Sequence, residues 1–476
     1  MNKFLLNTTE LRFDPPARAF ARFDQSEPPD LTEAKEALIA FEAVDAEWLM
    51  RWPGFNGGRD TTEFLEQWAA YWRGLGDPTA QRGDDRYAEV PIYRLEMTTR
   101  RDDWFFQELE KHHQDPRWME FIADPDGERT VDVFGNLFTA PVEARYHMRH
   151  ESGMLSRALN IVFDMDTWPD ADEAAIRGNL SPAADYLAVY DIGQGSATGL
   201  LGSDRRPYLY FDLGCGVYRN ASTAPANLRF CWTHKPSVVL SHWDADHWAG
   251  ANKDNQALSR SWITPRQKIG PVHSTFASSI INAGGTVLVW TSPSTISLGI
   301  GQRSLELSLC TGSGRNGSGI AMTVADAHTH QSWLLTGDAG YHQLRNSPRN
   351  DLSAVVVPHH GANMGPRSQA PSPGANLSYQ RLLYSFGPGN SHGKTAVQHP
   401  TVHAVTQHQA QGWQHGTWRN AANPGTSRAG QDVLATAEHP SNHLDGAIVA
   451  WAQPPNLSPL PCAGSTPNCT IALNQS

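Results

Sequence analysis

The sequence predicts a mixed α/β domain that follows an acidic, mainly α-helical domain. Charge and histidine content both change near residue 180, and these two observations favour the division. Residues 1–180 contain 35 acidic and 20 basic residues, whereas residues 181–476 contain 14 acidic and 18 basic ones. Only 4 of the 20 His residues lie in the first part. We therefore expect a helical domain over residues 1–180, a chemistry-bearing domain over residues 183–455 and a C-terminal tail over residues 456–476.

Three stretches predict helices in the first part. Leu31–Trp52 is rich in Ala, Leu and Glu, Thr62–Arg73 begins with a capping residue, and Arg101–His113 precedes an Asp-Pro pair. We expect the aromatic residues of this part in its core: Trp48, Trp68, Trp72, Trp104, Phe105 and Trp118. Four histidines lack acidic partners at ligand spacing and are expected to be structural or exposed: His112, His113, His147 and His150. No catalytic motif is visible here, so the function of this domain stays open.

Apolar runs of strand length recur through the second part. They are Tyr186–Tyr190, Pro207–Leu213, Leu305–Leu309, Ile320–Ala325, Ser332–Thr336 and Ser353–Val357. Asp338 and His360 each follow the end of such a run. Because strand ends at one edge of a sheet converge, residues that are distant in the sequence are expected to share one site there.

The strongest chemical signal lies in residues 237–250, which read SVVLSHWDADHWAG. An apolar strand runs directly into His242, Asp244, Asp246 and His247. Alternation places the first three side chains on one side of an extended chain, and His247 joins them as the chain begins to coil. Imidazole and carboxylate are ligands that zinc and manganese accept, so this stretch predicts a metal site.

Further motifs surround this stretch in a fixed order. The matching residues are Asp191, Gly193, Gln194 and Gly195; Asp212 and Gly214; His242, Asp244, Asp246, His247 and Gly250; Asn316 and Ser318; Gly337 and Asp338; Pro358, His359, His360 and Gly361; and Gly387, Asn390, His399 and Pro400. This series, over about residues 186–453, resembles the metallo-β-lactamase fold. Within that fold it is most similar to the hydrolase domain of the ComEC-type DNA-uptake competence proteins.

The resemblance implies an αββα sandwich with metal ions at one edge. His242 and Asp244 would hold one ion, and Asp246, His247 and His360 would hold another, with Asp338 between the two. Asp244 stands where the broad family has His, and Asn316 occupies the region of a further family His. Because carboxylate favours a harder ion than imidazole does, the resemblance implies two divalent ions, zinc or manganese, one of them weakly held.

The implied activity is hydrolysis by a metal-bound hydroxide, with phosphodiesters as substrate. Asp246 would also orient the hydroxide and pass on its proton. His399 is equally well explained as a residue at the start of the helix expected over Thr401–Gln411. The expected catalytic residues are Asp246, His359 and His399, and the expected substrate contacts are Asn390, Lys394 and Arg367.

Four functions remain open at this point. The competence-type resemblance and the basic second part favour nucleic acid, yet Arg367 is the sole cation between Ala362 and Leu377, and no basic run marks a nucleic-acid groove. A small phosphodiester such as a phosphocholine ester is a second possibility, and an acyl ester is a third. A metal-stabilised binding module without turnover is a fourth. The acidic first domain is expected to control access to the site or to bind a protein partner.

Compartment and redox state follow from composition. The sequence contains no apolar run of about 18 residues, and its first residues have too short an apolar core for a signal peptide. We therefore expect a cytoplasmic protein without membrane contact, with export by a signal-free route left open. Of the five Cys residues, Cys462 and Cys469 lie close enough in sequence for a local disulfide.

Overall fold

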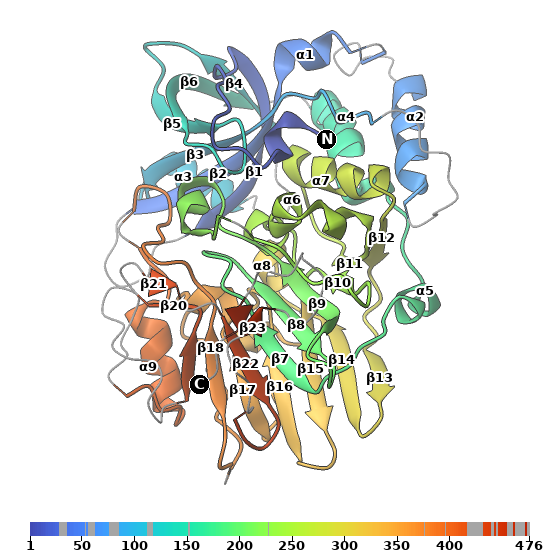
Figure 1. Cartoon of the computed structure of the whole chain (residues 1–476). Helices are drawn as coiled ribbons and strands as arrows, with labels where there is room; N and C mark the ends of the chain where they lie inside the picture. Colours follow the sequence, from blue (N-terminus) through green and yellow to red (C-terminus); the bar gives the residue numbers. More distant parts are fainter. Residues whose placement is uncertain are drawn as a thin grey trace. The chain divides into compact units, whose positions relative to one another are not determined.

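The protein was analysed as a computed structural model that divides into two compact units (Figure 1). The first unit consists of Met1–Asp170, Arg266–Val289 and His392–Ala396, and the second consists of Ala171–Pro265, Trp290–Ser391 and Val397–Ser476. Two segments that we expected in the second domain thus belong to the first unit. The structure describes residues 1–27, 36–52, 54–55, 62–75, 85–111, 118–150, 153–226, 228–375, 377–395, 397–416, 432–438, 442–443, 446–454, 460–461 and 472–473. His112, His113, Cys462 and Cys469 lie outside the described residues.

A closed β-barrel forms the core of the first unit. Its strands follow the order β1-β2-β3-β5-β6-β4 and comprise β1 (Arg18–Glu27), β2 (Glu36–Asp45), β3 (Ile92–Arg100), β4 (Trp118–Ala123), β5 (Arg129–Phe134) and β6 (Val142–His150). The expectation of a mainly helical domain is therefore wrong. Most of the described part of Leu31–Trp52 is strand β2, and only the short helix α1 (Ala46–Met50) follows it.

Burial explains why β2 is a strand despite its helix-forming composition. Eight consecutive residues of β2 are buried, so side chains on both faces of the strand pack against other groups. Phe41 lies in the centre of this core, with its ring centroid 5.9 Å from Phe23, 5.1 Å from Phe121 and 6.4 Å from Phe105. Ala, Leu and Glu favour a helix in isolation, but strand pairing and burial decide the conformation here.

Helices accompany the barrel within the first unit. They include α2 (Thr62–Arg73), α3 (Trp104–Lys111), α4 (Gly153–Phe163) and α7 (Pro271–Asn282), and strand β12 (Thr286–Trp290) follows α7. Helix α2 has the expected bounds, and α3 lies inside the expected stretch Arg101–His113. Trp68, Trp72, Phe105 and Trp118 are buried as expected. Trp104 contradicts the prediction, because 68% of it is exposed.

Asp164 joins segments of the first unit that are far apart in sequence. Its carboxylate lies 2.9 Å from Arg22 Nη2 and 3.3 Å from Lys268 Nζ, and it accepts a hydrogen bond from the Ile269 amide at 3.1 Å. Burial alone would raise the pKa of Asp164, but the charges of Arg22 and Lys268 outweigh burial and lower that pKa. The ionised carboxylate thus stabilises the folded unit.

Replacing this carboxylate should make stability depend less on pH. Asp164→Asn leaves Arg22 buried beside a neutral group, which should lower the free energy of unfolding by about 3–5 kcal/mol at neutral pH. Because the folded pKa is lowered, the contribution is present above the unfolded pKa of about 3.9 and is lost as pH falls through the folded pKa. Urea unfolding from pH 7 to pH 2 should show the two proteins converging in acid. Asp166→Asn, which removes an exposed partner of Lys268, should change stability little. An equal deficit at every pH would contradict the assignment.

Two sheets form the second unit. Within this unit the first sheet has the order β11-β10-β9-β8-β7-β22, and the second has the order β13-β14-β15-β16-β17-β18-β19. The strands of the first are β7 (Tyr186–Val189), β8 (Ala197–Leu201), β9 (Pro207–Leu213), β10 (Ser237–Val239), β11 (Ser261–Pro265) and β22 (Ala447–Ala450). Those of the second are β13 (Ile296–Ile300), β14 (Arg303–Leu309), β15 (Ile320–Asp326), β16 (Gln331–Leu335), β17 (Leu352–Val356), β18 (Arg381–Tyr384) and β19 (Val433–Ala435). The unit is mixed α/β, as the sequence predicts.

Parallel pairing brings the ends of several strands to the same edge. Strands β9, β10 and β11 run parallel in the first sheet, and β16, β17, β18 and β19 run parallel in the second. The two sheets also contact each other. The rings of Trp333 in β16 and Trp451 after β22 stack with centroids 3.7 Å apart, and Ser385 after β18 donates a hydrogen bond to the Gly195 carbonyl at 2.8 Å. The loops that follow these strands are therefore held close together.

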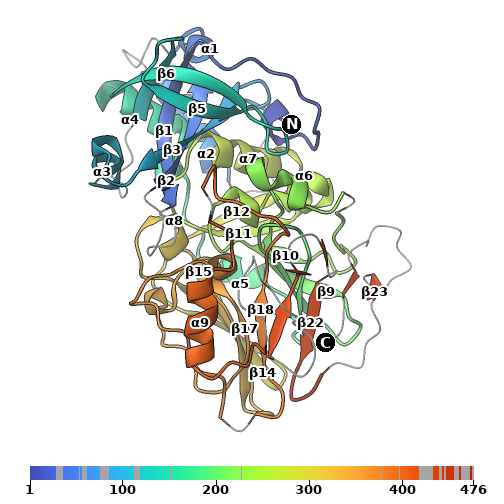
Figure 2. The same ribbon diagram turned by 90° about the vertical axis from the view of Figure 1, so that its left-hand side faces the viewer.

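Helix α9 (Val402–Ala410) packs on the second sheet (Figures 1 and 2). Its Val405 belongs to the same apolar cluster as Val355 and Leu382, and Thr401 caps its first turn. Other short helices of this unit are α5 (Glu173–Gly178), α6 (Gly250–Lys253) and α8 (Gly314–Gly317). The remaining described elements are η1 (Lys3–Leu5), η3 (Met165–Thr167), η4 (Tyr218–Thr223), η5 (Ala245–His247), η6 (Asn255–Ser259), η7 (Tyr341–Gln343), η8 (Pro358–Gly361), β20 (Ala437–Glu438), β21 (Asn442–His443), β23 (Leu460–Pro461) and β24 (Ala472–Leu473).

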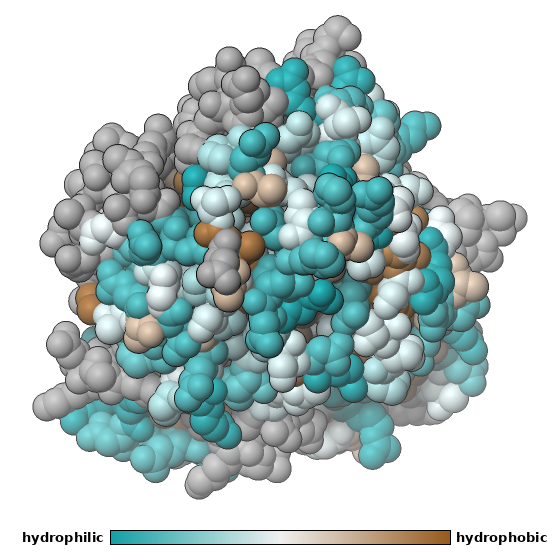
Figure 3. Space-filling view, turned by 90° about the horizontal axis from the view of Figure 1, so that it is seen from below, coloured by the Kyte–Doolittle hydropathy of each residue, from teal (hydrophilic) through white to brown (hydrophobic). Residues whose placement is uncertain are grey.

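Among the described residues, no helix combines the length and the apolar character that a membrane crossing needs. On the face drawn in Figure 3, hydrophilic residues predominate and apolar residues form only small separate groups. The residues drawn in colour on this face therefore form no broad apolar patch.

Candidate metal centre

The site begins where strand β10 ends. Ser241 fixes the backbone of this turn, because its amide donates a hydrogen bond to Asp212 Oδ1 at 2.6 Å and its carbonyl accepts one from the Ile320 amide at 2.7 Å. His242 follows immediately. The chain then passes Asp244 and forms the short 3₁₀ helix η5, which carries Asp246 and His247. The coil that we expected at His247 is thus present.

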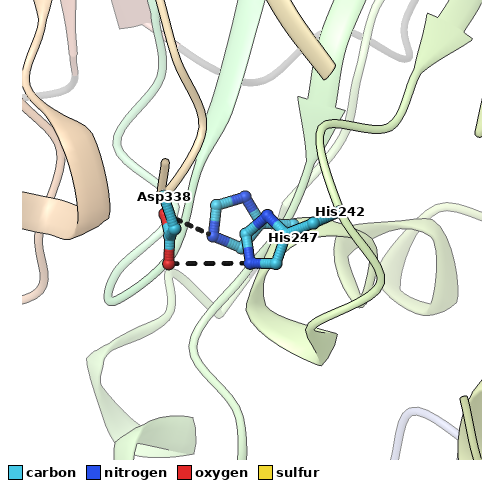
Figure 4. Close-up of side chains that lie close together, drawn as sticks. All are labelled: His242, His247 and Asp338. Atoms are coloured by element: carbon cyan, nitrogen blue, oxygen red, sulfur yellow. Dashed lines mark ion pairs between the residues drawn. The ribbon is translucent and has the colours of Figure 1, made fainter. Parts of the chain in front are cut away.

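Six of the expected metal ligands gather at this turn. Asp338 follows β16 and His360 follows β17, so both reach the turn from parallel strand ends. His247 Nε2 lies 3.1 Å from Asp338 Oδ1, and His242 Nε2 lies 3.6 Å from Asp338 Oδ2 (Figure 4). His360 Nε2 lies 3.1 Å from Asp246 Oδ2. The structure therefore brings together residues from three separate motifs, as the sequence predicts.

Two groups of three ligand atoms are compact enough to hold an ion. The first is His242, His247 and Asp338, and the second is Asp246, His247 and His360. Within each group the ligand atoms lie within 4.8 Å of one another. Both groups contain His247.

Two imidazole nitrogens show that the residues fit a cation. His242 Nε2 and His247 Nε2 are buried and have no hydrogen-bond partner among the described residues. Buried polar atoms normally have a partner, because an unsatisfied one costs about 1–3 kcal/mol. Figure 4 shows both rings turned toward the Asp338 carboxylate. A divalent ion between these atoms would satisfy both nitrogens, and nitrogen with carboxylate oxygen is a ligand set that zinc accepts.

Asp212 orients His247 from the side opposite the ligand group. Its Oδ2 accepts a hydrogen bond from His247 Nδ1 at 2.8 Å and another from the Ser241 hydroxyl at 2.8 Å. With its hydrogen on Nδ1, His247 presents the Nε2 lone pair to the cluster. Asp212 holds this position with a positive φ of 61°, which is uncommon for a residue other than Gly. Asp212 is one of the sequence motif residues, but the motif does not reveal that Asp212 orients His247.

The backbone of the motif at residues 358–361 is similarly constrained. His359, His360 and Gly361 have φ values of 48°, 55° and 86°. Consecutive left-handed residues are costly unless the surrounding structure holds them, and such strain is concentrated at functional sites. His360 Nδ1 lies 3.0 Å from the Ser385 carbonyl, which directs Nε2 toward Asp246. The Ser385 carbonyl thus orients the His360 imidazole in the same way that Asp212 orients the His247 imidazole.

Two motif glycines leave room for the turns. A Cβ atom on Gly214 would lie 1.7 Å from the Asp246 carbonyl oxygen. Gly337 has a φ of 56°, and a Cβ there would lie 2.5 Å from Ser241 Oγ. No larger side chain fits either position without moving a ligand, which explains why Gly accompanies the acidic residues in these motifs.

The charges of the ligands compensate one another. Burial would lower the pKa of His247, but Asp338, Asp212 and Asp246 outweigh burial and raise it well above its usual value. Burial would raise the pKa of Asp338, yet the neighbouring imidazoles lower it well below the usual value. The carboxylates of the cluster therefore favour protonated imidazoles between them. A divalent ion would take the place of these protons.

Asp244 has a partner that the sequence analysis missed. Arg315 Nε lies 2.6 Å from Asp244 Oδ1, and both side chains are less than a tenth exposed. Asp244 Oδ2 lies 3.4 Å from His242 Nε2. The motif comparison pointed to Asn316 and Ser318 in this region, whereas the contact is made by the residue just before Asn316. The partners are 71 positions apart in the sequence, so no local signal indicates the pair.

The other expected catalytic residues lie beside the ligands. His359 Nε2 is 3.5 Å from Asp338 Oδ2, and its side chain is 16% exposed. The His399 ring packs edge-on against it, with centroids 5.3 Å apart. Asn390 is fully buried, and its side chain accepts a hydrogen bond from the His399 amide and donates one to the His399 carbonyl. Asn390 therefore holds the His399 backbone, which corrects the expectation that it contacts substrate.

Lys394 and Arg367 are the other expected substrate contacts. Lys394 belongs to the first unit, where its Nζ lies 3.1 Å from both Asp132 and Glu143. Lys394 thus pairs with two carboxylates, and its contact with substrate stays a prediction. Arg367 is exposed, and its charge together with burial lowers the pKa of His342.

A third group of possible ligands lies inside the first unit. Glu42 Oε1 is 2.7 Å from His273 Nε2, and Asp24 Oδ1 is 3.7 Å from the same nitrogen. The other oxygens are engaged, since Arg94 Nη1 lies 2.7 Å from Asp24 Oδ2 and the Val272 amide donates to Glu42 Oε2 at 2.8 Å. This arrangement is that of a buried ion-pair network that attaches α7 to the barrel.

Comparisons with known proteins give little beyond the geometry. No protein-family model matches the chain, and no curated protein matches it. Solved structures do match, among them the zinc-bound PqqB from Methylobacterium extorquens. PqqB shares 9% sequence identity at a TM-score of 0.24, over 36% of this chain and 71% of PqqB. The ComEC-type resemblance therefore stays a prediction from the sequence motifs.

Proposed function

We propose that the second unit is a metal-dependent hydrolase of the metallo-β-lactamase type that cleaves phosphodiester bonds, with nucleic acid as the preferred substrate. One observation carries the proposal. Histidine and aspartate side chains from separate strand ends lie close together. Two of their imidazole Nε2 atoms, those of His242 and His247, are buried and have no hydrogen bond among the described residues. When bound, a divalent ion would supply the Lewis-acid charge that activates water and stabilises the transition state of hydrolysis.

The exposure of the ligands assigns their functions. Asp246 is 26% exposed, whereas His242, His247, Asp338 and His360 are at most 3% exposed. The buried side chains would bind the ion. Asp246 is the ligand that solvent reaches, so we assign to it the orientation of the attacking water and the acceptance of its proton.

His359 is suited to the other end of the reaction. Its imidazole lies beside Asp338 and is partly exposed, so it is placed to donate a proton to the leaving oxygen. His399 is 5% exposed and packs against the His359 ring, which makes it a positioning residue in this proposal. The excess of basic over acidic residues in residues 181–476 supports a polyanionic substrate.

A substrate panel tests the proposal. Labelled single-stranded DNA, double-stranded DNA, RNA and bis(p-nitrophenyl) phosphate would be incubated with zinc, manganese or a chelator. We expect metal-dependent cleavage of nucleic acid that the chelator abolishes. Cleavage of the small diester alone would move the substrate to small phosphodiesters. No turnover of any substrate by the metal-loaded protein would contradict the proposal and favour a binding module.

A further inference from the structure

Arg315 contacts Asp244, one of the residues expected to hold a metal ion. It lies on the short helix α8 between strands β14 and β15, and its side chain is 7% exposed. Its Nε is 2.6 Å from Asp244 Oδ1. Asp244 and His242 are the residues that the family resemblance assigns to the first of two ions. A guanidinium on Oδ1 neutralises this carboxylate and places positive charge beside Oδ2, the oxygen that faces His242 Nε2.

The ligand geometry points in the same direction. The two compact groups share His247, and neither includes Asp244. His247 Nδ1 is hydrogen-bonded to Asp212, so only the lone pair on Nε2 is available to an ion. One lone pair binds one ion, which means that the two groups are alternatives and cannot be filled at the same time.

Charge supports one ion as well. Three carboxylates, those of Asp244, Asp246 and Asp338, face the imidazole Nε2 atoms of the cluster. Arg315 already neutralises Asp244, which leaves two carboxylates to balance one divalent ion. A second divalent ion would bring two positive charges beside a buried guanidinium that cannot lose its proton.

We propose that this centre holds one divalent ion and that the Arg315 guanidinium replaces the second. His247 binds the ion, together with either His242 and Asp338 or Asp246 and His360. Arg315 holds Asp244 and supplies fixed positive charge next to the ion. This inference uses the metal centre of the proposed function but does not depend on hydrolysis or on the substrate.

Metal counting on the full chain tests the inference. Metal-free protein would be equilibrated with buffered zinc, freed of excess metal and assayed for metal by mass spectrometry. We expect one zinc per chain for the wild type and for Arg315→Lys, which keeps the charge. Arg315→Gln removes the positive charge on Asp244 and the repulsion, so it should bind two zinc ions. Arg345→Gln, which changes an exposed arginine of the same unit, should still bind one.

Cobalt provides a second readout. One high-spin cobalt ion per chain gives an isolated paramagnetic signal, whereas two neighbouring ions couple magnetically. We expect the isolated signal in the wild type and coupling in Arg315→Gln. Two coupled ions in the wild type, or one ion in Arg315→Gln with a native unfolding transition, would overturn the inference. Zero metal in the wild type would overturn it together with the proposed metal centre, whereas one ion without any hydrolysis would contradict only the proposed function.

Discussion

Asp246→Asn should reduce phosphodiester hydrolysis by about 10²–10⁴-fold, the usual contribution of a positioned general base. Asn keeps the shape of the side chain but loses the negative charge that orients water and accepts its proton. Asp246 is the ligand most exposed to solvent, at 26%, so the substitution disturbs little packing. Steady-state rates on bis(p-nitrophenyl) phosphate and on DNA measure the effect.

Asp204→Asn is the matched control for Asp246. Asp204 lies in the same unit, is 38% exposed and contacts His234 at 2.6 Å. Its substitution should leave hydrolysis unchanged. If Asp246→Asn retained the wild-type rate with a normal unfolding transition, the assignment of Asp246 would be wrong.

His247→Ala should remove the bound metal and all hydrolysis, because both compact ligand groups contain this imidazole. His242→Ala tests whether the metal depends on His247 more than on the other histidine of the turn. His242 belongs to one group only, so its loss leaves Asp246, His247 and His360 in place. We expect zinc content near one per chain in His242→Ala and near zero in His247→Ala. Metal analysis after dialysis measures both.

Folding has to be measured alongside these metal contents. His247→Ala leaves the buried Asp212 carboxylate without its imidazole partner, which should cost about 3–5 kcal/mol of stability. Thermal unfolding of each variant shows whether the unit is still folded. His234→Ala, which removes a partly exposed histidine of the same unit, should keep both the metal and the stability. Retention of zinc at wild-type affinity by His247→Ala would refute the ligand assignment.

Much of the second unit is predictable because its signals are local. Strand β9 has the expected bounds Pro207–Leu213, and β10, β16 and β17 begin and end within about one or two residues of the expected positions. Asp338 and His360 were expected at the site because each follows a parallel strand. The turn at 241–247 was expected because four ligand residues follow an apolar strand within six positions.

The first unit and parts of the site are not predictable from such signals. Strand β2 has the composition of a helix, and only closure of the barrel explains its conformation. Lys394 lies between motif residues of the second unit, yet the fold places residues 392–396 in the first unit. Arg315 and Asp244 meet across 71 residues, and Asp212 acts through a backbone conformation that its residue type does not specify. These features depend on tertiary packing.

Metal held by this buried His and Asp cluster is expected to drive phosphodiester hydrolysis. The most direct measurement follows the hydrolysis rate of metal-free protein as zinc or manganese is added, with the bound metal counted in the same samples. We expect no hydrolysis without metal and a rate that rises in proportion to bound metal until one ion per chain is reached. Full hydrolysis by metal-free protein, or none by protein that holds its ion, would contradict this expectation.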